Sequence, residues 1–516
     1  MNASKHQSLI SHAGSWTVGD LISREAQRNP TAPALEDASR TVSFSELVIT
    51  TSRIANLLYE LNVSRGERIA ILSENSIEYV EIVIAAAKIG VIVSVLNWRL
   101  SETELHHCIT LVSPKIIFTS ERFDQKLANF NNEPWLIIKI DSDLEKAVQK
   151  SRPMAPPVDL DPEDGFIIVY TSGTTGLPKG ALISHRAELA RSLVSRLDVG
   201  LERGDTFVAW PPMFHMVSIE HALHTLFVGG KVIIVDGADT SRLADLIASE
   251  PQWWLVLIPG MIEELAAEVK RRHVKPKNIK VIGALADLVS PTLIGEISGL
   301  LNAPYWNTFG STETGMLPVA GTRFPIGGYP NDLSKQHNSL YLWKLTSPDG
   351  QPVGKGGVGE MTVRGPTVFS GYWNAPEVNE KEFRDGWFHM GDMFIENDDG
   401  TFSYADRIKY MIKSGGENIY PAEIERTLLK DPAVAEAVVV RKKHEKWGEV
   451  PVAYIAVRGT DIPDVDRLVR LCKDRMADYK CPHEFFFVKA EDFPRSTSGK
   501  VQRGTVELWS RGKDDG

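Results

Sequence analysis

One glycine- and hydroxyl-rich loop constrains this chain more than any other segment. Residues 170–180 read YTSGTTGLPKG, and Lys179 lies near the end of the loop. The apolar runs 166–170 (FIIVY) and 181–185 (ALISH) on either side are typical of buried strands. A glycine loop between strands can turn backbone N–H groups toward an anion, because no Cβ blocks the approach. The hydroxyls and the lysine add donors and a positive charge, so the segment predicts a polyphosphate site.

The loop differs from a Walker A loop. In that motif the lysine directly follows a glycine and precedes a serine or threonine. Here Lys179 follows Pro178 and precedes Gly180. A hairpin loop that binds no ligand is the alternative for a short glycine-rich segment. The hydroxyl residues and the lysine favour the phosphate site, because a plain turn does not need them.

Length and charge limit the classes of protein that fit. A chain of 516 residues is too long for one hydrophobic core, so we expect at least two domains. The formal net charge of −10 argues against nucleic acid or an anionic membrane as the main partner. The three cysteines, Cys108, Cys472 and Cys481, form no CxxC pair and predict neither a zinc site nor a disulfide framework. We expect reduced thiols in a cytoplasmic protein.

The most apolar window, residues 79–97, has about the length of a membrane span. Glu81, Lys88 and Gly90 interrupt it, so a buried helix (78–89) followed by a strand (91–96) is the prediction. The first 16 residues carry no apolar signal core. We therefore expect a soluble protein without a membrane span.

Helix-like and strand-like segments alternate through the first 330 residues. Residues 43–62 are a predicted helix, with Ser43 as N-cap and Glu46 completing a capping box. This alternation predicts parallel sheets covered by helices, with site residues in loops at the carboxyl ends of strands. The strand-like runs are residues 68–73, 115–120, 231–236, 253–259, 280–283 and 303–310.

The pattern changes after about residue 330, where short strands with Gly and Asp turns predict an antiparallel β region. The last hundred residues predict a small α+β unit. We therefore expect an α/β fold: a large N-terminal domain of helix-covered β-sheets plus a β-barrel-like subdomain, and a small mobile C-terminal lid domain. The expected domains are residues 1–406 and 407–516, with the junction at 405–409.

Four more motifs follow the glycine loop. Residues 308–315 (TFGSTETG) offer Thr312 and Glu313, and Mg²⁺ prefers one or two such carboxylates plus substrate oxygens. The others are residues 386–392 (GWFHMGD), 405–425 (ADRIKYMIKSGGENIYPAEIE) and 494–503 (PRSTSGKVQR).

Taken in order, the five motifs resemble the adenylate-forming superfamily, which includes acyl- and aryl-CoA synthetases and firefly luciferase. The resemblance runs from about Trp16 to Arg503. It implies that a small-molecule carboxylic acid reacts with ATP to give an acyl-adenylate and pyrophosphate. The acyl group then passes to the thiol of coenzyme A, giving acyl-CoA and AMP. ATP, Mg²⁺ and coenzyme A are therefore expected.

The resemblance also assigns roles to residues. Lys500 is implied to place positive charge beside the carboxylate and the α-phosphate, Thr312 to bond the α-phosphate, and Glu313 to hold Mg²⁺. Around the nucleoside, Asp392 and Arg407 hold the ribose, Phe309 stacks on adenine, and Asn307 belongs to the same set. The residues implied to hold the β- and γ-phosphates are Thr171, Ser172, Gly173, Thr174, Thr175, Gly176 and Lys179.

For the second half-reaction the resemblance implies a rotation of the lid about Lys409. The rotation withdraws Lys500 and brings in residues 414–418, where Gly415 and Gly416 let the backbone approach a pantetheine arm. One site then performs both reactions without admitting water to the adenylate.

The acyl side is implied to include His215, also expected in the catalytic set, with Met216, Gly283 and Ala284. His215 stands where amino-acid-activating relatives have a carboxylate beside the aromatic residue, so an α-amino acid is disfavoured. Residues 283–287 (GALAD) and 327–335 depart from the family pattern, and Met390 replaces a common threonine. A medium-sized, partly apolar acid is the expectation.

Three alternatives stay open: an acyl-AMP ligase that loads a separate carrier protein, a luciferase-like oxygenase, and a non-catalytic nucleotide-binding homologue that acts as a scaffold. The intact set Lys179, Glu313, Asp392, Arg407 and Lys500 argues against the last. The identity of the acid and the oligomeric state, including a homodimer, are not determined by the sequence.

Overall fold

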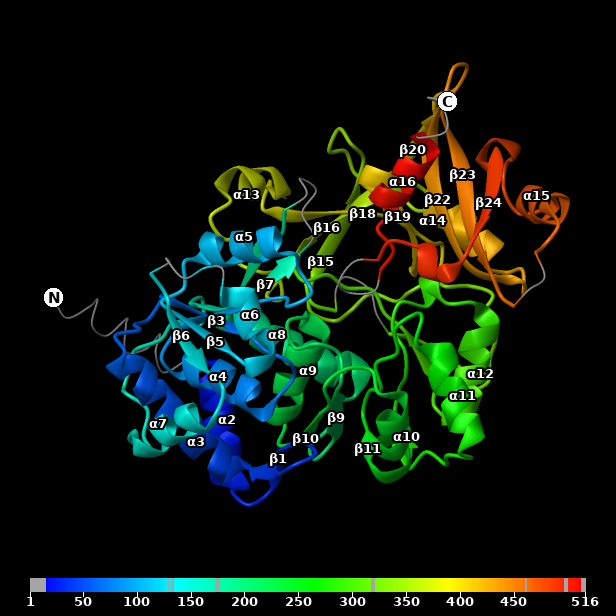
Figure 1. The fold of residues 1–516 in the computed structure, drawn as a ribbon. Helices are drawn as coiled ribbons and strands as arrows, with labels where there is room; N and C mark the ends of the chain where they lie inside the picture. Colours follow the sequence, from blue (N-terminus) through cyan, green and yellow to red (C-terminus); the bar gives the residue numbers. More distant parts are fainter. Residues whose placement is uncertain are drawn as a thin grey trace.

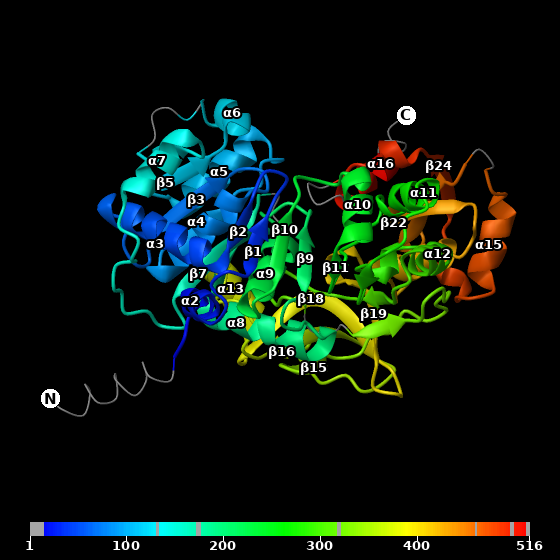
Figure 2. The ribbon, with the colours of Figure 1, turned by 90° about the horizontal axis from the view of Figure 1, so that it is seen from below.

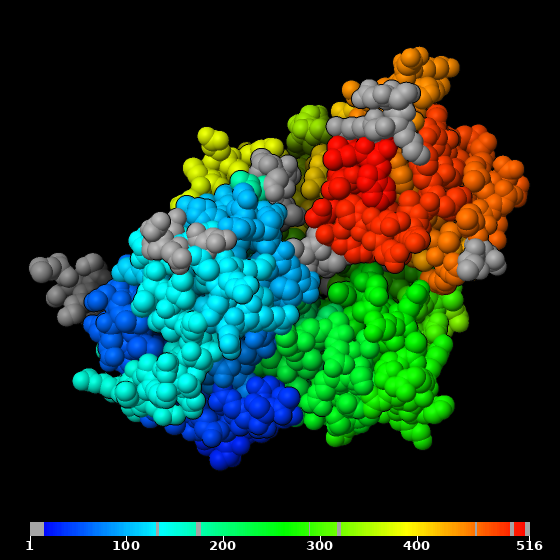
Figure 3. Space-filling view, viewed as in Figure 1, coloured from blue at the N-terminus to red at the C-terminus, as the bar shows by residue number. Residues whose placement is uncertain are grey.

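The computed structural model describes residues 15–128, 130, 134–171, 177–316, 321–459, 462–495 and 500–511. It has a large N-terminal domain and a smaller C-terminal domain that stands over one end of it (Figure 1). In the space-filling view the C-terminal domain, orange to red, rests on the green part of the large domain (Figure 3). The expected α/β class with two domains of unequal size is confirmed.

The first sheet of the large domain contains the glycine loop. Its strand order is β6-β5-β3-β4-β7-β8, and all neighbours are parallel except β7 and β8. These strands are β3 (Arg68–Leu72), β4 (Ile92–Val95), β5 (Ile116–Thr119), β6 (Leu136–Lys139), β7 (Gly165–Thr171) and β8 (Lys179–Ser184).

The second sheet has the order β2-β1-β10-β9. Single parallel bridges extend it, from Phe207 to Trp254, from Leu255 to Ile282, and from Ile282 to Tyr305. The loops after Ile282 and after β13 therefore leave neighbouring chain segments on the same side, as predicted for parallel strands. Its strands are β1 (Pro33–Glu36), β2 (Thr41–Ser43), β9 (Thr206–Ala209) and β10 (Lys231–Ile234). At the end of the bridges, β13 (Tyr305–Asn307) and β14 (Thr322–Phe324) form a separate antiparallel pair.

Two sequence-based expectations for these sheets need correction. The runs 253–259 and 280–283 form bridges rather than full strands, beside the two-residue β11 (Pro251–Gln252) and β12 (Asn278–Ile279). The sheets are also not purely parallel, because β2 and β8 are antiparallel edge strands. The connection between β7 and β8 is too short for a parallel crossover, which needs a dozen or more residues.

Helices surround both sheets, and Figure 2 shows α2, α3 and α4 on the blue side of the molecule. In α3 the Ser43 hydroxyl accepts a hydrogen bond from the Glu46 backbone and the Glu46 carboxylate accepts from the Ser43 backbone, so the predicted capping box is confirmed. The predicted helix and strand within residues 79–97 are α4 and β4. The helices are α2 (Val18–Arg28), α3 (Phe44–Glu60), α4 (Ile77–Lys88), α5 (Glu102–Val112), α6 (Asp124–Ala128), α7 (Ser142–Lys150), α8 (His185–Val194), α9 (Met216–Phe227), α10 (Thr240–Ser249), α11 (Ile262–Arg271) and α12 (Pro291–Leu301).

Among the described residues, no helix has both the length and the apolar character needed to cross a membrane.

An antiparallel sheet completes the large domain, as predicted for the region after residue 330. Its order is β15-β16-β18-β17, and β19 pairs with β18. The register places Asp392 of β18 opposite Arg407 of β19. The elements are β15 (Leu342–Thr346), β16 (Val358–Arg364), α13 (Pro376–Glu382), β17 (Phe383–Arg384), β18 (Trp387–Glu396) and β19 (Phe402–Arg407).

The C-terminal domain follows the 3-10 turn Ile408–Tyr410. Its sheet has the order β21-β20-β23-β22, with β24 parallel to β23, and its own apolar core includes Leu428, Val439 and Ile455. Its elements are β20 (Ile412–Ser414), β21 (Glu417–Ile419), α14 (Pro421–Leu428), β22 (Val434–His444), β23 (Gly448–Val457), α15 (Val465–Lys473), β24 (Glu484–Val488) and α16 (Arg503–Arg511).

Candidate functional site

The glycine loop closes a hairpin between β7 and β8. Thr171 and Lys179 are directly paired across these antiparallel strands, and both are partly exposed. The predicted phosphate-binding residues Ser172, Gly173, Thr174, Thr175 and Gly176 lie outside the described residues.

Lys179 is linked to Glu313 through Tyr372. The Tyr372 hydroxyl donates to Glu313 Oε1 at 2.7 Å, and Lys179 Nζ lies 3.9 Å from the centroid of the Tyr372 ring. Burial lowers the pKa of Lys179, and the carboxylates of Glu382 and Glu313 partly oppose this shift. Burial and Glu313 raise the pKa of Tyr372, so the phenol stays protonated and donates. The structure thus brings the predicted lysine and the predicted metal carboxylate into one cluster.

A tight turn presents Thr312 and Glu313. Ser311 and Gly315 exchange backbone hydrogen bonds of 3.1 and 2.9 Å, which leaves both predicted residues at the tip, partly exposed. A Cβ on Gly310 would lie 2.4 Å from the Gly315 carbonyl oxygen, so no larger residue fits there. The turn therefore aims a hydroxyl and a carboxylate at the same region.

Arg191 of α8 supports this turn from inside the protein. Its guanidinium donates to the carbonyl oxygens of Thr312 (3.1 Å) and Thr367 (2.9 Å) and forms a close ion pair with Glu220 of α9. Arg191 is 2% exposed. Removing one partner of a buried ion pair leaves an uncompensated charge and typically costs about 3–5 kcal/mol. This pair therefore holds the Thr312 backbone firmly.

Asp392 and Arg407 form the predicted ribose pair. Arg407 Nε donates to Asp392 Oδ1 at 3.0 Å, and the Tyr404 hydroxyl lies 3.5 Å from the same oxygen. Asp392 Oδ2 is buried, and no group among the described residues is hydrogen-bonded to it. Burial raises the pKa of Asp392, and the Arg407 charge opposes this shift. An unpaired buried carboxylate oxygen is costly, and a hydroxyl group from a ligand would satisfy it.

Lys500 lies close enough to Arg407 and Asp392 for their charges to affect it. Loss of hydration and the Arg407 charge lower the pKa of Lys500, and Asp392 partly opposes them. Its side chain is nevertheless exposed. Among the described residues, no hydrogen bond or ion pair fixes its ammonium group. Lys500, the predicted catalytic lysine, is therefore within electrostatic range of Asp392 and Arg407, the predicted ribose residues.

Arg503 anchors the segment that carries Lys500. It opens α16 and forms ion pairs with Asp406 (3.1 Å) and Glu425 (2.6 Å). Asp406 also accepts a hydrogen bond from the Ala422 backbone at the start of α14 (2.8 Å). Asp406, the residue beside Arg407, is thus tied to the starts of α14 and α16.

The predicted adenine side is closely packed. Phe309 is 7% exposed, and its ring lies 5.1 Å from that of Tyr404 and 5.0 Å from that of Phe394. Asn307 is buried and donates to the Leu333 carbonyl oxygen at 2.8 Å, while its own Oδ1 has no partner. A stack of Phe309 on adenine stays a prediction.

Gly283 and Ala284 lie against Tyr305. A Cβ on Gly283 would lie 2.4 Å from the Tyr305 ring, and Gly283 has a φ of +91°. The Tyr305 hydroxyl donates to the Ala284 carbonyl oxygen at 2.8 Å. Leu285, inside the segment 283–287 that departs from the family pattern, has a φ of +45°, so the departure in sequence comes with a left-handed backbone.

His215 and Met216 stand at the start of α9, where both are partly exposed. Further along the same helix, His221 Nε2 lies 3.3 Å from Met316 Sδ and Glu220 binds Arg191. The helix that carries the predicted acyl-side residues therefore packs directly against the Thr312 turn.

The predicted second-reaction residues lie elsewhere. Gly415 and Gly416 form the exposed turn between β20 and β21, with φ values of +59° and +92°. Lys409 is exposed in the turn between the domains, with Nζ 4.9 Å from the centroid of the Tyr410 ring. The structure therefore places Lys500 within electrostatic range of Asp392 and leaves the turn at Gly415 and Gly416 exposed on the surface of the C-terminal domain.

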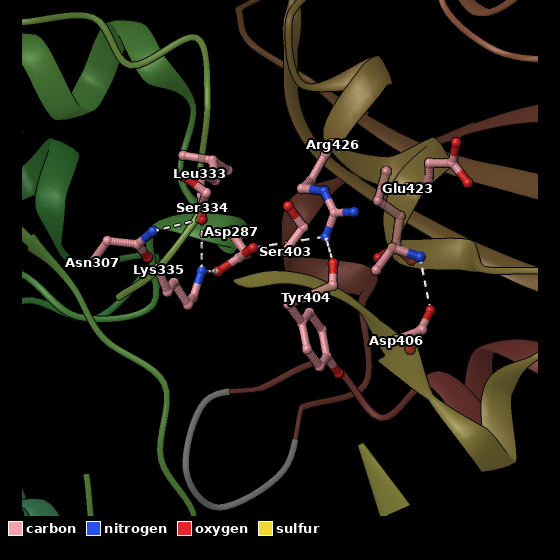
Figure 4. Close-up of polar contacts among 12 residues, drawn as sticks. Asp287, Asn307, Leu333, Ser334, Lys335, Ser403, Tyr404, Asp406, Glu423 and Arg426 are labelled. Atoms are coloured by element: carbon pink, nitrogen blue, oxygen red, sulfur yellow. Dashed lines mark hydrogen bonds and ion pairs between the residues drawn. The ribbon is translucent and has the colours of Figure 1, made fainter. Parts of the chain in front are cut away.

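The lid also contacts the large domain beside a cavity of about 460 Å³. Buried Lys335 pairs with Asp287, and Arg426 of α14 lies 3.7 Å from Asp287 and donates to the Tyr404 carbonyl oxygen at 2.8 Å (Figure 4). The residues that line this cavity come from both domains and do not include Glu313, Asp392 or Lys500.

The chain matches known proteins over nearly its whole length. Residues 22–373 match the family described as AMP-binding enzyme, and residues 423–500 match the AMP-binding enzyme C-terminal domain. The chain belongs to this family. The indoleacetate–CoA ligase of Aromatoleum aromaticum is 32% identical over 514 residues, covering 95% of this chain and 97% of that protein. A feruloyl-CoA synthase of an Amycolatopsis species is 31% identical over 506 residues, covering 96% and 98%.

Among solved structures, the anthranilate CoA ligase in complex with anthranoyl-AMP shares the fold of this AMP-binding enzyme. The TM-score is 0.88, with 22% identity over 97% of this chain and 98% of that one.

Four residues of the site were missed by sequence reasoning: Arg191, Tyr372, Tyr404 and Arg503. Arg503 lay inside a motif, three residues after Lys500, but received no role. The other three gave no local signal, because their partners are distant in sequence and only the fold brings them together.

Proposed function

We propose that this AMP-binding enzyme activates an aromatic carboxylic acid with ATP and transfers the acyl group to coenzyme A. The single observation that carries the proposal is the group Asp392, Arg407 and Lys500. Among the described residues, the buried Asp392 carboxylate keeps one oxygen without a hydrogen-bond partner, Arg407 donates to the other oxygen, and Lys500 lies near enough for the charges of both residues to act on it. This set can receive a ribose and the developing charge on an α-phosphate.

The first half-reaction joins two anions. An oxygen of the acid's carboxylate attacks the α-phosphorus of ATP, and the bond to the bridging oxygen of pyrophosphate breaks. The main task is neutralisation and in-line alignment of charge, which preorganised cations perform well. In this proposal Lys500 stands between the two reactants, Thr171 and Lys179 hold the leaving phosphates, and Thr312 bonds the α-phosphate.

Glu313 is the proposed metal residue. Its carboxylate is partly exposed at the tip of a rigid turn, and Tyr372 occupies only Oε1, so Oε2 can face a cation. Mg²⁺ is commonly held by one or two carboxylates together with phosphate oxygens. When bound, it would supply positive charge to those oxygens.

The second half-reaction breaks the acyl–phosphate bond. The thiol sulfur of coenzyme A attacks the acyl carbon, AMP leaves, and the thiol proton is released. We propose that residues 1–406 and 407–516 move as two bodies about Lys409, which replaces Lys500 with the turn at Gly415 and Gly416. The exposed position of this turn in the present arrangement supports such an exchange.

The aromatic substrate class rests on two observations. The relatives described above are named for indoleacetate and ferulate, and the solved neighbour for anthranilate. The region behind the Thr312 turn is rich in buried aromatic rings, since Trp254 packs against both His221 and Trp306. The same proposal includes a contact of His215 or Met216 with the acid.

A cytoplasmic location and a homodimer complete the proposal. The three cysteines are free and buried, as is common in a reducing compartment. Light scattering of the purified protein tests the dimer directly.

The test is an acid-dependent exchange of pyrophosphate into ATP over a panel of aryl, arylalkyl and aliphatic acids. We expect exchange with several aromatic acids, and thioester only when coenzyme A is added. A parallel reaction with a phosphopantetheinylated carrier protein distinguishes a carrier-loading ligase. No exchange with any acid would contradict the proposal and favour a non-catalytic nucleotide-binding protein.

A further inference from the structure

Tyr372 lies in the segment between β16 and α13, outside all five motifs of the site. This segment pairs with the outer edge of β8. Ser370 donates to the Leu182 carbonyl oxygen (2.8 Å), Leu182 to that of Gly371 (3.0 Å), and Trp373 to that of Gly180 (2.8 Å). The backbone around Tyr372 is therefore continuous with the hairpin that carries the glycine loop.

The same segment also reaches the Glu313 turn. The Phe369 backbone N–H donates to the Glu313 carbonyl oxygen at 2.9 Å. At Tyr372 itself, the side chain of Asn379 satisfies both backbone groups, accepting at 2.7 Å and donating at 2.8 Å. Tyr372 thus stands on a fixed backbone between the two elements that the proposed function assigns to phosphate and metal.

Each part of the Tyr372 side chain serves one of these elements. Its hydroxyl donates to Glu313 Oε1, and among the described residues no other side chain is hydrogen-bonded to that carboxylate. The face of its ring lies under Lys179 Nζ at 3.9 Å. A hydrogen bond to a ligating carboxylate orients it, and losing such a bond commonly costs about 10- to 100-fold in metal affinity.

We propose that Tyr372 is a positioning residue that sets the distance between the metal carboxylate and the phosphate lysine. Its hydroxyl turns the Glu313 carboxylate so that Oε2 faces the bound metal, and its ring seats the Lys179 ammonium beside the same phosphates. This inference rests on the proposed function and extends it to a residue that contacts neither ATP nor the acid.

The hydroxyl is tested with Tyr372→Phe, which keeps the ring, and with Mn²⁺ as a paramagnetic probe in the presence of a non-hydrolysable ATP analogue. We expect the Kd of Mn²⁺ to rise by about tenfold or more. The matched control is Tyr79→Phe, because the Tyr79 hydroxyl is fully buried without a partner and lies in α4. This control should leave the Kd unchanged.

A double-mutant cycle shows whether the effect passes through Glu313. In a Glu313→Gln background, Tyr372→Phe should change the Kd of Mn²⁺ by less than about twofold. An equal tenfold loss in both backgrounds, or no loss in the wild-type background, overturns the positioning role. If the wild-type protein binds no Mn²⁺ with the nucleotide, the proposed function fails as well, so the two failures are distinguishable.

The ring is tested with Tyr372→Leu, in a titration of ATP without metal. Relative to Tyr372→Phe, we expect the Kd for ATP to rise by about threefold, because a cation–π contact is lost. The difference should disappear in a Lys179→Met background. Thermal melting checks that each variant folds, and Tyr372→Met replaces Tyr372→Leu should the latter fail. Equal Kd values for the phenylalanine and leucine variants contradict the ring's role.

Discussion

The two ends of the site are built differently. The phosphate end, with Lys179, Tyr372 and Glu313, belongs entirely to the large domain and is joined by backbone hydrogen bonds between β8 and the segment around Tyr372. The ribose end depends on two domains, since Lys500 comes from the lid and Asp392 from β18. The first group of residues is therefore contained in one domain, whereas the second combines residues of both domains.

This difference indicates a division of labour. We expect the group at Lys179 to bind ATP whatever the position of the C-terminal domain, because Lys179, Tyr372 and Glu313 all belong to the large domain. We expect Lys500 to act on the group at Asp392 only in the domain arrangement seen here. Mutations at the two ends should therefore affect different steps of the reaction.

The largest effect is expected for Lys500→Ala. It should lower the rate of adenylate formation by about 100-fold or more, because a preorganised charge at the reacting phosphate is lost. Thioester formation from a presynthesised acyl-adenylate should stay within about twofold of wild type. Rapid-quench assays of the two half-reactions measure both rates. Equal losses of rate in the two half-reactions would contradict a role of Lys500 that is limited to adenylate formation.

The second largest effect is expected for Lys179→Met. Losing a charged donor to phosphate is expected to weaken ATP binding by roughly 10- to 100-fold, whatever the position of the lid. Calorimetry on the full chain and on a Lys500→Ala background measures this loss. The same loss of ATP affinity in both backgrounds supports the independence of the two ends. A loss that depends strongly on Lys500 contradicts it.

Arg407→Met should shift the pH dependence of the KM for ATP to higher pH. Burial raises the pKa of Asp392 and Arg407 opposes this, so removing Arg407 raises that pKa further. Asp392 would then take up a proton at a higher pH, and the KM for ATP should begin to rise at a higher pH as the solution is acidified. KM measured from pH 5 to 9 tests this sign. An unchanged profile would show that Asp392 does not bind the nucleotide as its anion.

The smallest effect is expected for Arg426→Ala. The variant loses one ion pair and one hydrogen bond between lid and large domain, both partly exposed, so stability should fall by less than about 1 kcal/mol. The balance between lid positions should still change by about two- to fivefold. The expected readout is a lower rate of adenylation relative to thioester formation, while Lys430→Ala, on the same cavity but in neither contact, changes neither rate.

Much of the fold follows from local patterns. Ser43 and Glu46 predicted a helix start that the structure reproduces, and Glu81 and Lys88 correctly marked residues 79–97 as a helix and a strand rather than a span. Edge strands were harder, because nothing in the β8 sequence distinguishes an antiparallel return from a parallel strand. Only the short connection after Thr171 decides it.

The site was predicted unevenly for a similar reason. Lys500 and Asp392 lie in motifs whose order resembles a known family, and the structure brings them near each other. Arg191 and Tyr372 act through partners that lie far away along the chain, Thr312 and Glu220 for the former and Lys179 and Glu313 for the latter. Single-sequence patterns do not encode such pairs, because each side chain alone is typical of an ordinary buried or half-buried position.

The unpaired Oδ2 of Asp392 carries a consequence for the resting protein. A buried acceptor without a hydrogen-bond partner destabilises the folded state, so the ligand-free protein is less stable than it would be with this oxygen hydrogen-bonded. Adenosine alone, lacking every phosphate, should therefore protect the protein against heat. At a concentration about 100 times its Kd the gain would approach roughly 2.7 kcal/mol, and Asp392→Ala should abolish this protection.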